Sequence, residues 1–292
     1  TSINKDVDFS KKETVSLTNI KLVSQIYSAN IPKRIYVDNE ELIVPGDIYN
    51  MCRYKFEWID INPQNRYYTS IDGIIYTADK KTLVRCPVGR IGRVVIPDGV
   101  TAIGRDAFRF CNISEAVIPD SVTEVGAAAF ADSHIEKLTF GKGMTYISKR
   151  MFRLCPSLKH IHIPSNIKEI MSSAFSSCKA MEDIVLDEGV ERIGPDAFEA
   201  NTTNDIKISL PSSVRMIESG ALRNIKNVTL TNKIPSGFFT SLYTSDSGAD
   251  IHVNIGGKQA SRVFRRWTIM SHFFRLMTGC SGSSICISAI ET

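Results

Sequence analysis

One short pattern returns along the chain at a nearly constant interval, and this repeat constrains the fold more than any other feature. In each copy an aliphatic residue precedes an aromatic residue, or a leucine in the last copy, by five positions, as in Ile103 and Phe108. Consecutive aliphatic positions are 22, 22, 23, 23 and 24 residues apart and fall at Ile103, Val125, Ile147, Ile170, Ile193 and Ile217. A fixed period in the twenties predicts a solenoid, in which each coil buries its apolar face only when a neighbour stacks on it.

Each copy also carries the pattern of a short strand. Seven residues before the aliphatic position an alternating apolar pair ends, such as Val94 and Ile96, and the residue between the two is expected to face outward. Prolines directly follow four of these pairs and are expected to end the strands, because proline cannot donate to a ladder. These prolines are Pro97, Pro119, Pro164 and Pro211. The strands should pair in parallel from coil to coil, and the segment before each aromatic is expected to form one helical or 3₁₀ turn.

The aromatic positions predict a column of rings inside the solenoid. Its expected members are Phe108, Phe130, Phe152, Phe175 and Phe198.

The segments IPDGVTAIGRDAFRFC, IPDSVTEVGAAAF and IPSNIKEIMSSAFSSCKAMEDIVL resemble the repeat unit of the BspA-like leucine-rich-repeat proteins. This resemblance implies an α/β repeat solenoid: a right-handed superhelix with a parallel sheet on its concave face, short helical turns on its convex face, and a β-hairpin insertion. Members of that family are mostly bacterial surface or secreted proteins linked to adhesion and to the binding of host proteins. The resemblance therefore favours a binding role.

We expect one solenoid over residues 1–257, because an elongated repeat can absorb a chain of this length as a single domain. Two weaker copies of the pattern precede the regular ones, Leu22 to Tyr27 and Val44 to Tyr49. Their strands are expected around Ile35 and Ile59, so the solenoid should begin near residue 15.

The register breaks between about residues 62 and 92, where the sequence predicts a β-hairpin insertion. The hairpin strands are expected at Gly73-Ile-Ile-Tyr and at Thr82-Leu-Val-Arg. Insertions in repeat proteins usually lie on the surface, so Tyr67, Tyr68 and Tyr76 either form an exposed binding patch or pack the hairpin onto the solenoid.

Residues 258–292 differ in composition and are expected to form a C-terminal cap, helical at least in part. Apolar residues at helical spacing, including Val263, Trp267 and Phe274, lie beside several arginines. This pattern fits a helix that covers the end of the core, and it also fits a basic amphipathic helix for a membrane surface or a partner.

Seven cysteines are present, and Cys52, Cys111, Cys155 and Cys178 each follow a repeat aromatic by three positions. A small, semi-apolar side chain suits a tight inner bend, so we interpret them as buried free thiols. A disulfide between Cys155 and Cys178, in register on adjacent coils, is the alternative.

Composition and motifs exclude several functions. The net charge is +4, from 35 basic and 31 acidic residues that are interspersed, so no basic stripe predicts nucleic-acid binding. No apolar run is long enough to span a bilayer. Phosphate-binding glycine loops, zinc-protease motifs and nucleophile elbows are absent, so we expect neither an enzyme nor a cofactor.

The outward positions of the strands are the candidate binding site. One row contains Lys137, His160, Asp183 and Lys207, and the row beside it contains Thr139, His162 and Val185. Alternating charge relieves repulsion between neighbouring strands, and the extended sheet of a solenoid is a surface that binds proteins. His160, His162 and Asp183 could also be considered as zinc ligands, but the sequence favours solvated members of a ladder.

These features lead to a non-enzymatic protein-binding or adhesion protein of the cell surface or secreted space. Its concave sheet would bind a protein partner from host extracellular matrix or serum, and the chain is expected to be a monomer. An intracellular interaction scaffold of the same fold is the alternative, because free thiols persist in reducing compartments. The opening residues TSINKDVDF contain no signal-peptide core, which fits both interpretations.

Overall fold

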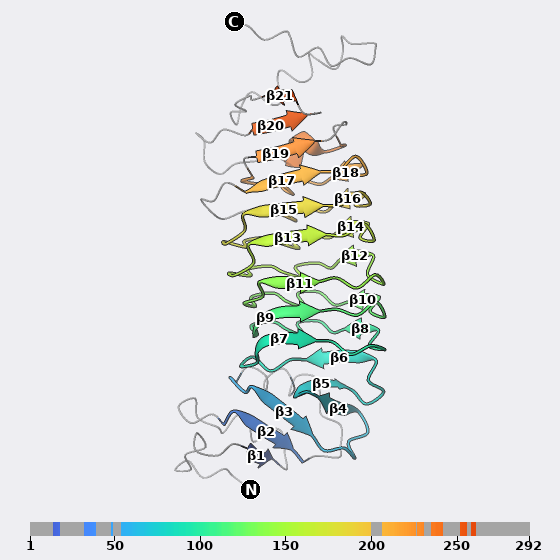
Figure 1. The fold of residues 1–292 in the computed structure, drawn as a ribbon, viewed down its shortest axis with the longest axis vertical. Coiled ribbons are helices and arrows are strands. Elements are labelled where there is room, and N and C mark those ends of the chain that lie inside the picture. Colours follow the sequence, from blue (N-terminus) through green and yellow to red (C-terminus); the bar gives the residue numbers. More distant parts are fainter. Residues whose placement is uncertain are drawn as a thin grey trace, which may run out of the picture.

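The described part of the chain forms a stack of coils in which strands lie one above another (Figure 1). The structure is a computed structural model, and it describes residues 14–17, 32–38, 48, 54–199, 206–225, 227–230, 235–241, 252–255 and 258–260. The predicted solenoid is confirmed, and its successive strands are parallel.

Each regular coil contains a long strand, then a short strand, then a turn that carries the aromatic residue. The long strands are β7 (Ile91–Val95), β9 (Asn112–Val117), β11 (Lys137–Thr139), β13 (His160–Ile163), β15 (Asp183–Leu186), β17 (Lys207–Leu210), β19 (Asn227–Leu230) and β20 (His252–Ile255). The short strands are β8 (Ala102–Ile103), β10 (Glu124–Val125), β12 (Tyr146–Ile147), β14 (Glu169–Ile170), β16 (Arg192–Ile193) and β18 (Met216–Ile217). The four prolines follow the ends of β7, β9, β13 and β17 as predicted.

The turns differ from the expected helical or 3₁₀ turns. In the coil of β12, the N–H of Phe152 donates to the carbonyl of Ala174 in the next coil at 2.7 Å. The N–H of Met151 instead donates within the turn, to the Ser148 carbonyl at 3.1 Å. Because every second N–H bonds to the neighbouring coil, consecutive helical bonds cannot form, and Arg150 adopts a left-handed φ of 58°. Within the described residues, α-helix is limited to α2 (Phe238–Ser241) and to Ile48, so the α/β description is not confirmed.

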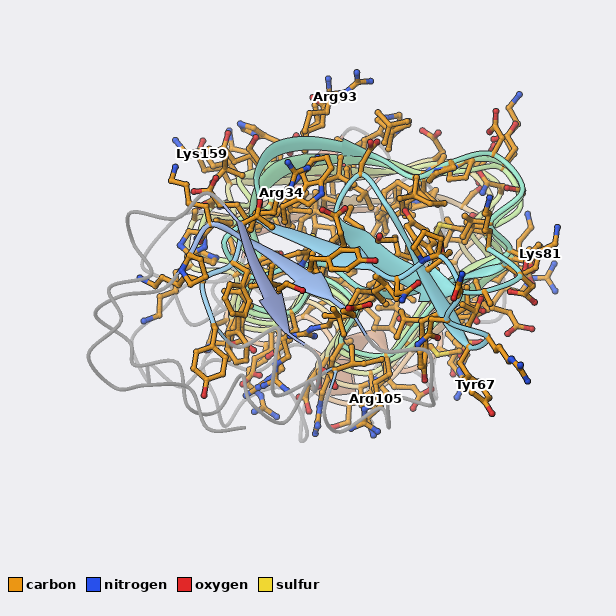
Figure 2. The ribbon with its side chains drawn as sticks, turned by 90° about the horizontal axis from the view of Figure 1, so that it is seen from below. Arg34, Tyr67, Lys81, Arg93, Arg105 and Lys159 are labelled. Atoms are coloured by element: carbon orange, nitrogen blue, oxygen red, sulfur yellow. The ribbon has the colours of Figure 1, made fainter. Side chains whose placement is uncertain are left out.

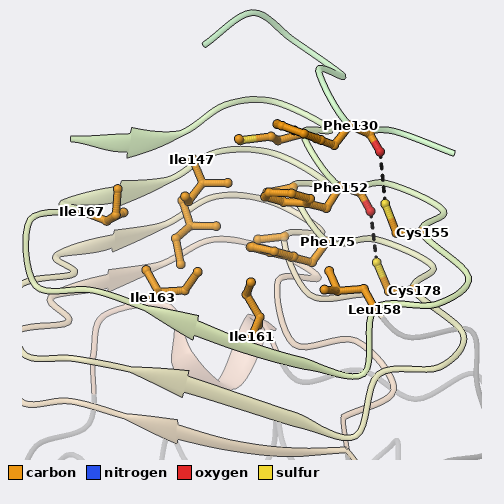
Figure 3. Packing of buried hydrophobic residues seen from close by; sticks show 14 of the residues in the cluster. Phe130, Ile147, Phe152, Cys155, Leu158, Ile161, Ile163, Ile167, Phe175 and Cys178 are labelled. Atoms are coloured by element: carbon orange, nitrogen blue, oxygen red, sulfur yellow. Dashed lines mark hydrogen bonds between the residues drawn. The ribbon is translucent and has the colours of Figure 1, made fainter. Parts of the chain in front are cut away.

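The aromatic column is confirmed, and it lies directly inside these turns (Figure 3). Phe152 is fully buried, and its ring stacks on Phe130 at 5.5 Å and on Phe175 at 5.1 Å between centroids. Phe108 and Phe198 extend the column at its two ends with stacked rings. The inter-coil hydrogen bonds of the turns hold these rings in register, so backbone ladder and core packing reinforce each other.

The prediction of buried free thiols is confirmed for Cys111, Cys155 and Cys178, and Cys86 is also a buried free thiol. The Cys155 thiol donates to the carbonyl of Phe130 at 3.1 Å, and the Cys178 thiol donates to the carbonyl of Phe152 at 3.0 Å (Figure 3). Each thiol thus bonds to a backbone oxygen of the preceding coil. Cys52 lies outside the described residues.

Both sheets are interrupted at the same coil, although the sequence predicted pairing throughout. Among the described strands, β11 pairs with β9 but not with β13, and β12 pairs with β14 but not with β10. The repeat lengthens here from 22 to 23 residues, between Leu138 and Ile161. The half-buried Phe140 also replaces the isoleucine of neighbouring coils, and no proline follows it. Repeat length alone does not break the pairing, because β13 and β15 pair across 23 residues and β15 and β17 across 24. The changed residues directly after β11 are the local difference at this coil.

The N-terminal end contains a separate parallel sheet that runs obliquely to the stacked strands (Figure 1). It consists of β1 (Thr14–Leu17), β2 (Arg34–Val37) and β3 (Trp58–Ile61). The two weak coils therefore have strands where they were predicted. Leu22 to Tyr27 lies outside the described residues, and of Val44 to Tyr49 only Ile48 is described, which is buried.

The insertion is an antiparallel meander rather than a surface excursion. It contains β4 (Tyr68–Ile71), β5 (Ile74–Thr77) and β6 (Thr82–Arg85), so the predicted hairpin is confirmed with one further strand. Strand β6 then pairs in parallel with β8, so the insertion provides the first layer of the short-strand sheet. Tyr76 is buried, Tyr68 is half-buried and Tyr67 is 48% exposed, so the three tyrosines do not form one exposed patch.

At the C-terminal end, β21 (Lys258–Ala260) pairs antiparallel with β20. The predicted helical cap over residues 258–292 therefore begins in a strand, and residues 261–292 lie outside the described part. Within the described residues, no helix is long and apolar enough to cross a membrane.

Candidate functional site

The outward positions of the long strands form two in-register rows, which we call the long-strand face. Arg93, Glu115 and Lys137 are direct neighbours on β7, β9 and β11, as predicted. Beyond the interruption, the same row continues through direct neighbours on the next four long strands: His160, Asp183, Lys207 and Asn227. Figure 2 shows Arg93 and Lys159 on this side of the molecule and Arg105, from a turn, on the opposite side.

The predicted site residues all lie on the long-strand face, and most are exposed. Exposed side chains are Lys137, Thr139, His160, His162, Val185 and Lys207, and Asp183 is half-buried. Lys137 and Thr139 belong to the sheet of β11, whereas the other five belong to the sheet of β13, β15 and β17. The site is therefore one surface carried by two sheets.

Charges on this face are partly paired. Glu115 lies 3.4 Å from the Arg93 guanidinium and 3.8 Å from the Lys137 ammonium, so one carboxylate is shared by two cations. Glu182 lies 3.7 Å from the ammonium of Lys159. These pairs are exposed and contribute little to stability, so the residues can vary without loss of the fold.

The two histidines of β13 interact with different carboxylates. His162 Nε2 lies 2.8 Å from Oδ1 of Asp187, the residue directly after β15. His160 Nε2 lies 3.9 Å from Oε2 of Glu182, the residue directly before β15. The ring nitrogens therefore do not converge on Asp183 as a zinc site would need. In the part of the chain that the structure describes, no group of three or more His, Cys, Asp or Glu residues could hold a metal.

Two buried titratable groups of the described residues have a raised pKa. Burial raises the pKa of the Cys155 thiol well above its ordinary value, so this cysteine is a neutral hydrogen-bond donor and not a nucleophile. Burial likewise raises the pKa of the Tyr76 phenol. Both residues are packed in the core, and neither supplies a reactive group to the surface.

Sequence reasoning missed a cluster at the N-terminal end of this face. The Trp58 ring has the guanidinium carbons of Arg34 and Arg90 at 4.5 and 4.8 Å from its centroid, and its N–H donates to Asp60 at 2.8 Å. Gly73 lies directly against the ring, where a Cβ would come within 2.5 Å. No spacing rule connects Trp58 with Arg90, because the insertion separates them; the outward position of Trp58 in the WIDI strand was the only available signal.

The parallel in-register coils, the buried phenylalanine column and the open strand face define a leucine-rich-repeat type of β-solenoid. Residues 88–205 match the protein-family model described as "BspA type Leucine rich repeat region", in six copies. Residues 88–205 thus consist of BspA-type leucine-rich repeats, as the sequence resemblance indicated. No curated protein matches it.

Solved structures of similar fold include a leucine-rich repeat protein from Bacteroides ovatus, with 20% identity and a TM-score of 0.55 over 77% of this chain and 55% of that one. The pneumococcal vaccine antigen PcpA is also similar, with 14% identity and a TM-score of 0.53 over 70% of this chain and 51% of that one. A leucine rich cell surface protein from Faecalibacterium prausnitzii has 23% identity and a TM-score of 0.49, over 79% and 49% of the two chains. The chain thus spans about half the length of these proteins, and at these identities the likeness concerns the fold alone.

Proposed function

We propose that this chain is a non-enzymatic binding protein that captures a protein partner on its long-strand face. The observation that carries the proposal is the exposed, in-register arrangement of Lys137, His160 and Lys207 with Thr139 and Val185 on one side of a rigid stack. The backbone of such a face is already fixed by the paired strands, so little backbone entropy is lost when a partner binds.

The composition of the face supports a protein partner. Small and β-branched side chains lie beside a row of alternating charge, which offers apolar contact and charge complementarity side by side. The described residues contain no cluster of metal ligands that would favour a metal function. We place the partner among host extracellular-matrix or serum proteins and the chain at the cell surface or in the secreted space. One of the similar solved proteins is described as a cell surface protein and another as a vaccine antigen, which agrees with this proposal.

The test reverses three charges of the face together, in a Lys137→Glu, Asp183→Lys, Lys207→Glu variant. We expect this variant to lose a partner that the unmodified chain captures from host serum or matrix extract, while the melting temperature stays nearly unchanged. Unchanged capture would exclude this face.

A matched control uses the exposed residues directly before β14, β16 and β18, which are Lys168, Glu191 and Arg215. Their charges are positive, negative and positive, as in the triple variant of the face. Reversing these three charges alters the same number of surface charges on another side of the coils. The control variant should therefore capture the partner as the unmodified chain does.

An intracellular interaction scaffold is the second candidate, and the four described free thiols favour it. Their burial, however, also protects thiols from oxidation in an exposed compartment. Protease treatment of intact source cells separates the two: loss of the protein indicates the surface, and survival until lysis indicates the interior.

A further inference from the structure

A second interaction surface lies where the long-strand sheet begins. Among the described strands, β7 pairs with β9 alone, so its other edge has no sheet neighbour. Four of its five residues are exposed, and the exposed fractions of Ile91 and Val95 are 67% and 53%. Strand β3, in the adjoining N-terminal sheet, runs obliquely to β7 and does not continue its ladder (Figure 1).

The backbone of β7 presents hydrogen-bonding groups to this open edge. The N–H of Ile96 donates to the Val117 carbonyl of the next coil at 3.0 Å, so Ile96 faces β9. Because alternate residues of a strand direct their N–H and C=O groups to opposite edges, Val94 also faces β9, whereas Arg93 and Val95 face the open edge. An extended segment placed there would find a donor and an acceptor at both positions, as in β-strand addition.

Charge indicates what kind of segment fits. Three guanidinium groups surround this edge, those of Arg34, Arg90 and Arg93. Two have carboxylate partners: Asp60 lies 3.3 Å from Arg34, and Glu115 lies 3.4 Å from Arg93. Within the described residues Arg90 has no ion pair and lies over the Trp58 ring. The edge therefore has an uncompensated positive charge beside a half-buried indole.

A second copy of this chain fits the edge poorly. Antiparallel pairing of two β7 edges about a twofold axis would bring Arg93 close to its own counterpart, and like charges on facing strands repel. The bulge at Gly92, which has a φ of 75°, also distorts the edge at that end. The occupant should instead carry carboxylates.

We propose that the β7 edge, together with the Arg34–Trp58–Arg90 cluster, is a docking site for an extended acidic segment of a partner protein. The segment adds as a strand beside β7, its apolar side chains contact Ile91 and Val95, and its carboxylates meet Arg90 and Arg93. This surface differs from the row of Lys137, Asp183 and Lys207 and is independent of it.

The test uses a short peptide of alternating glutamate and valine, capped at both ends, and a lysine–valine peptide of equal length. The chain has two tryptophans, so a Trp267→Phe background leaves Trp58 as the fluorescent reporter. We expect saturable binding of the acidic peptide with a shift in Trp58 emission, and binding of the basic peptide that is weaker by about tenfold or more.

Three variants test the edge itself. Val95→Pro removes an N–H that faces the open edge and leaves the groups that pair with β9 in place, so binding should weaken about tenfold or more while circular dichroism is unchanged. Val95→Ala keeps the N–H and should retain most of the binding. Arg90→Gln should weaken the acidic peptide without helping the basic one.

Three results would overturn the proposal: no binding of the acidic peptide at about 1 mM, equal binding by Val95→Pro, or equal affinity for both peptides. Concentration-dependent dimerisation that Val95→Pro abolishes would also overturn it, because the occupant would then be a second copy of the chain.

Discussion

Removal of one ring from the centre of the phenylalanine column tests whether the column holds the coils together. Phe152 is fully buried and stacks on a ring from each neighbouring coil, with centroids 5.5 and 5.1 Å away. Phe152→Ala would remove roughly 150 Å² of buried apolar surface. At about 25 cal/mol per Å², this loss lowers the free energy of unfolding by about 4 kcal/mol. The cavity has little room to collapse, because the turn hydrogen bonds fix the backbone on both sides.

Phe140 is a matched control on the same coil. Its ring meets Phe152 edge-on, with centroids 6.4 Å apart, but the residue is only half-buried. Phe140→Ala should therefore lower the free energy of unfolding by about 2 kcal/mol or less, because Phe140 buries less apolar surface on folding than Phe152 does.

Urea unfolding followed by far-ultraviolet circular dichroism measures both variants against the unmodified chain. Phe152→Leu, which retains most of the volume, should cost less than about 1.5 kcal/mol. If Phe152→Ala lowered the free energy of unfolding by less than about 1.5 kcal/mol, or by no more than Phe140→Ala, the column would not be the main support of the stack.

Three further predictions concern backbone packing, thiol protection and acid stability. Gly126→Ala should lower the free energy of unfolding by about 1–3 kcal/mol in the same urea assay, because the added Cβ would lie 2.4 Å from the backbone nitrogen of Arg105. Cys155 should resist alkylation in the folded chain and react after unfolding, as read by peptide mass spectrometry, because burial raises the pKa of its thiol; labelling of the folded chain would contradict its burial. The backbone N–H and then the hydroxyl of Ser212 lower the pKa of Glu188 from its ordinary 4.5. The stabilisation by Glu188 is therefore present above the unfolded pKa and is lost as pH falls through the lowered value, so the melting-temperature difference from Glu188→Gln should shrink on acidification; a constant difference would refute this.

The candidate site could be predicted where it follows from the repeat and could not where it depends on the insertion. The outward rows are a direct consequence of alternation, so the positions of Lys137, Asp183 and Lys207 were predictable. The Trp58–Arg90 contact and the open edge of β7 were not, because they arise where two sheets meet at an angle after an irregular segment. Nothing in the local sequence specifies how such sheets are oriented.

The helical turns are the clearest case in which tertiary structure decided the local conformation. The segments before the aromatics contain alanine, arginine and serine, which suit a helical turn, but each N–H has a competing carbonyl in the next coil. Every second N–H bonds to that coil, and residues four positions apart in the turn, such as Arg150 and Leu154, adopt a left-handed φ. Such a competition depends on neighbours about 22 residues away along the chain.

Sequence alone determined the period, the buried columns and the ends of four long strands, because apolar spacing and proline act within one coil. Only the tertiary structure decided where the sheets break, how the turns bond and which edge stays open. Those outcomes depend on whether the backbone groups of adjacent coils lie opposite one another. The break between β11 and β13 is an example: the apolar pattern continues across it, and repeats of the same or greater length elsewhere keep their strands paired.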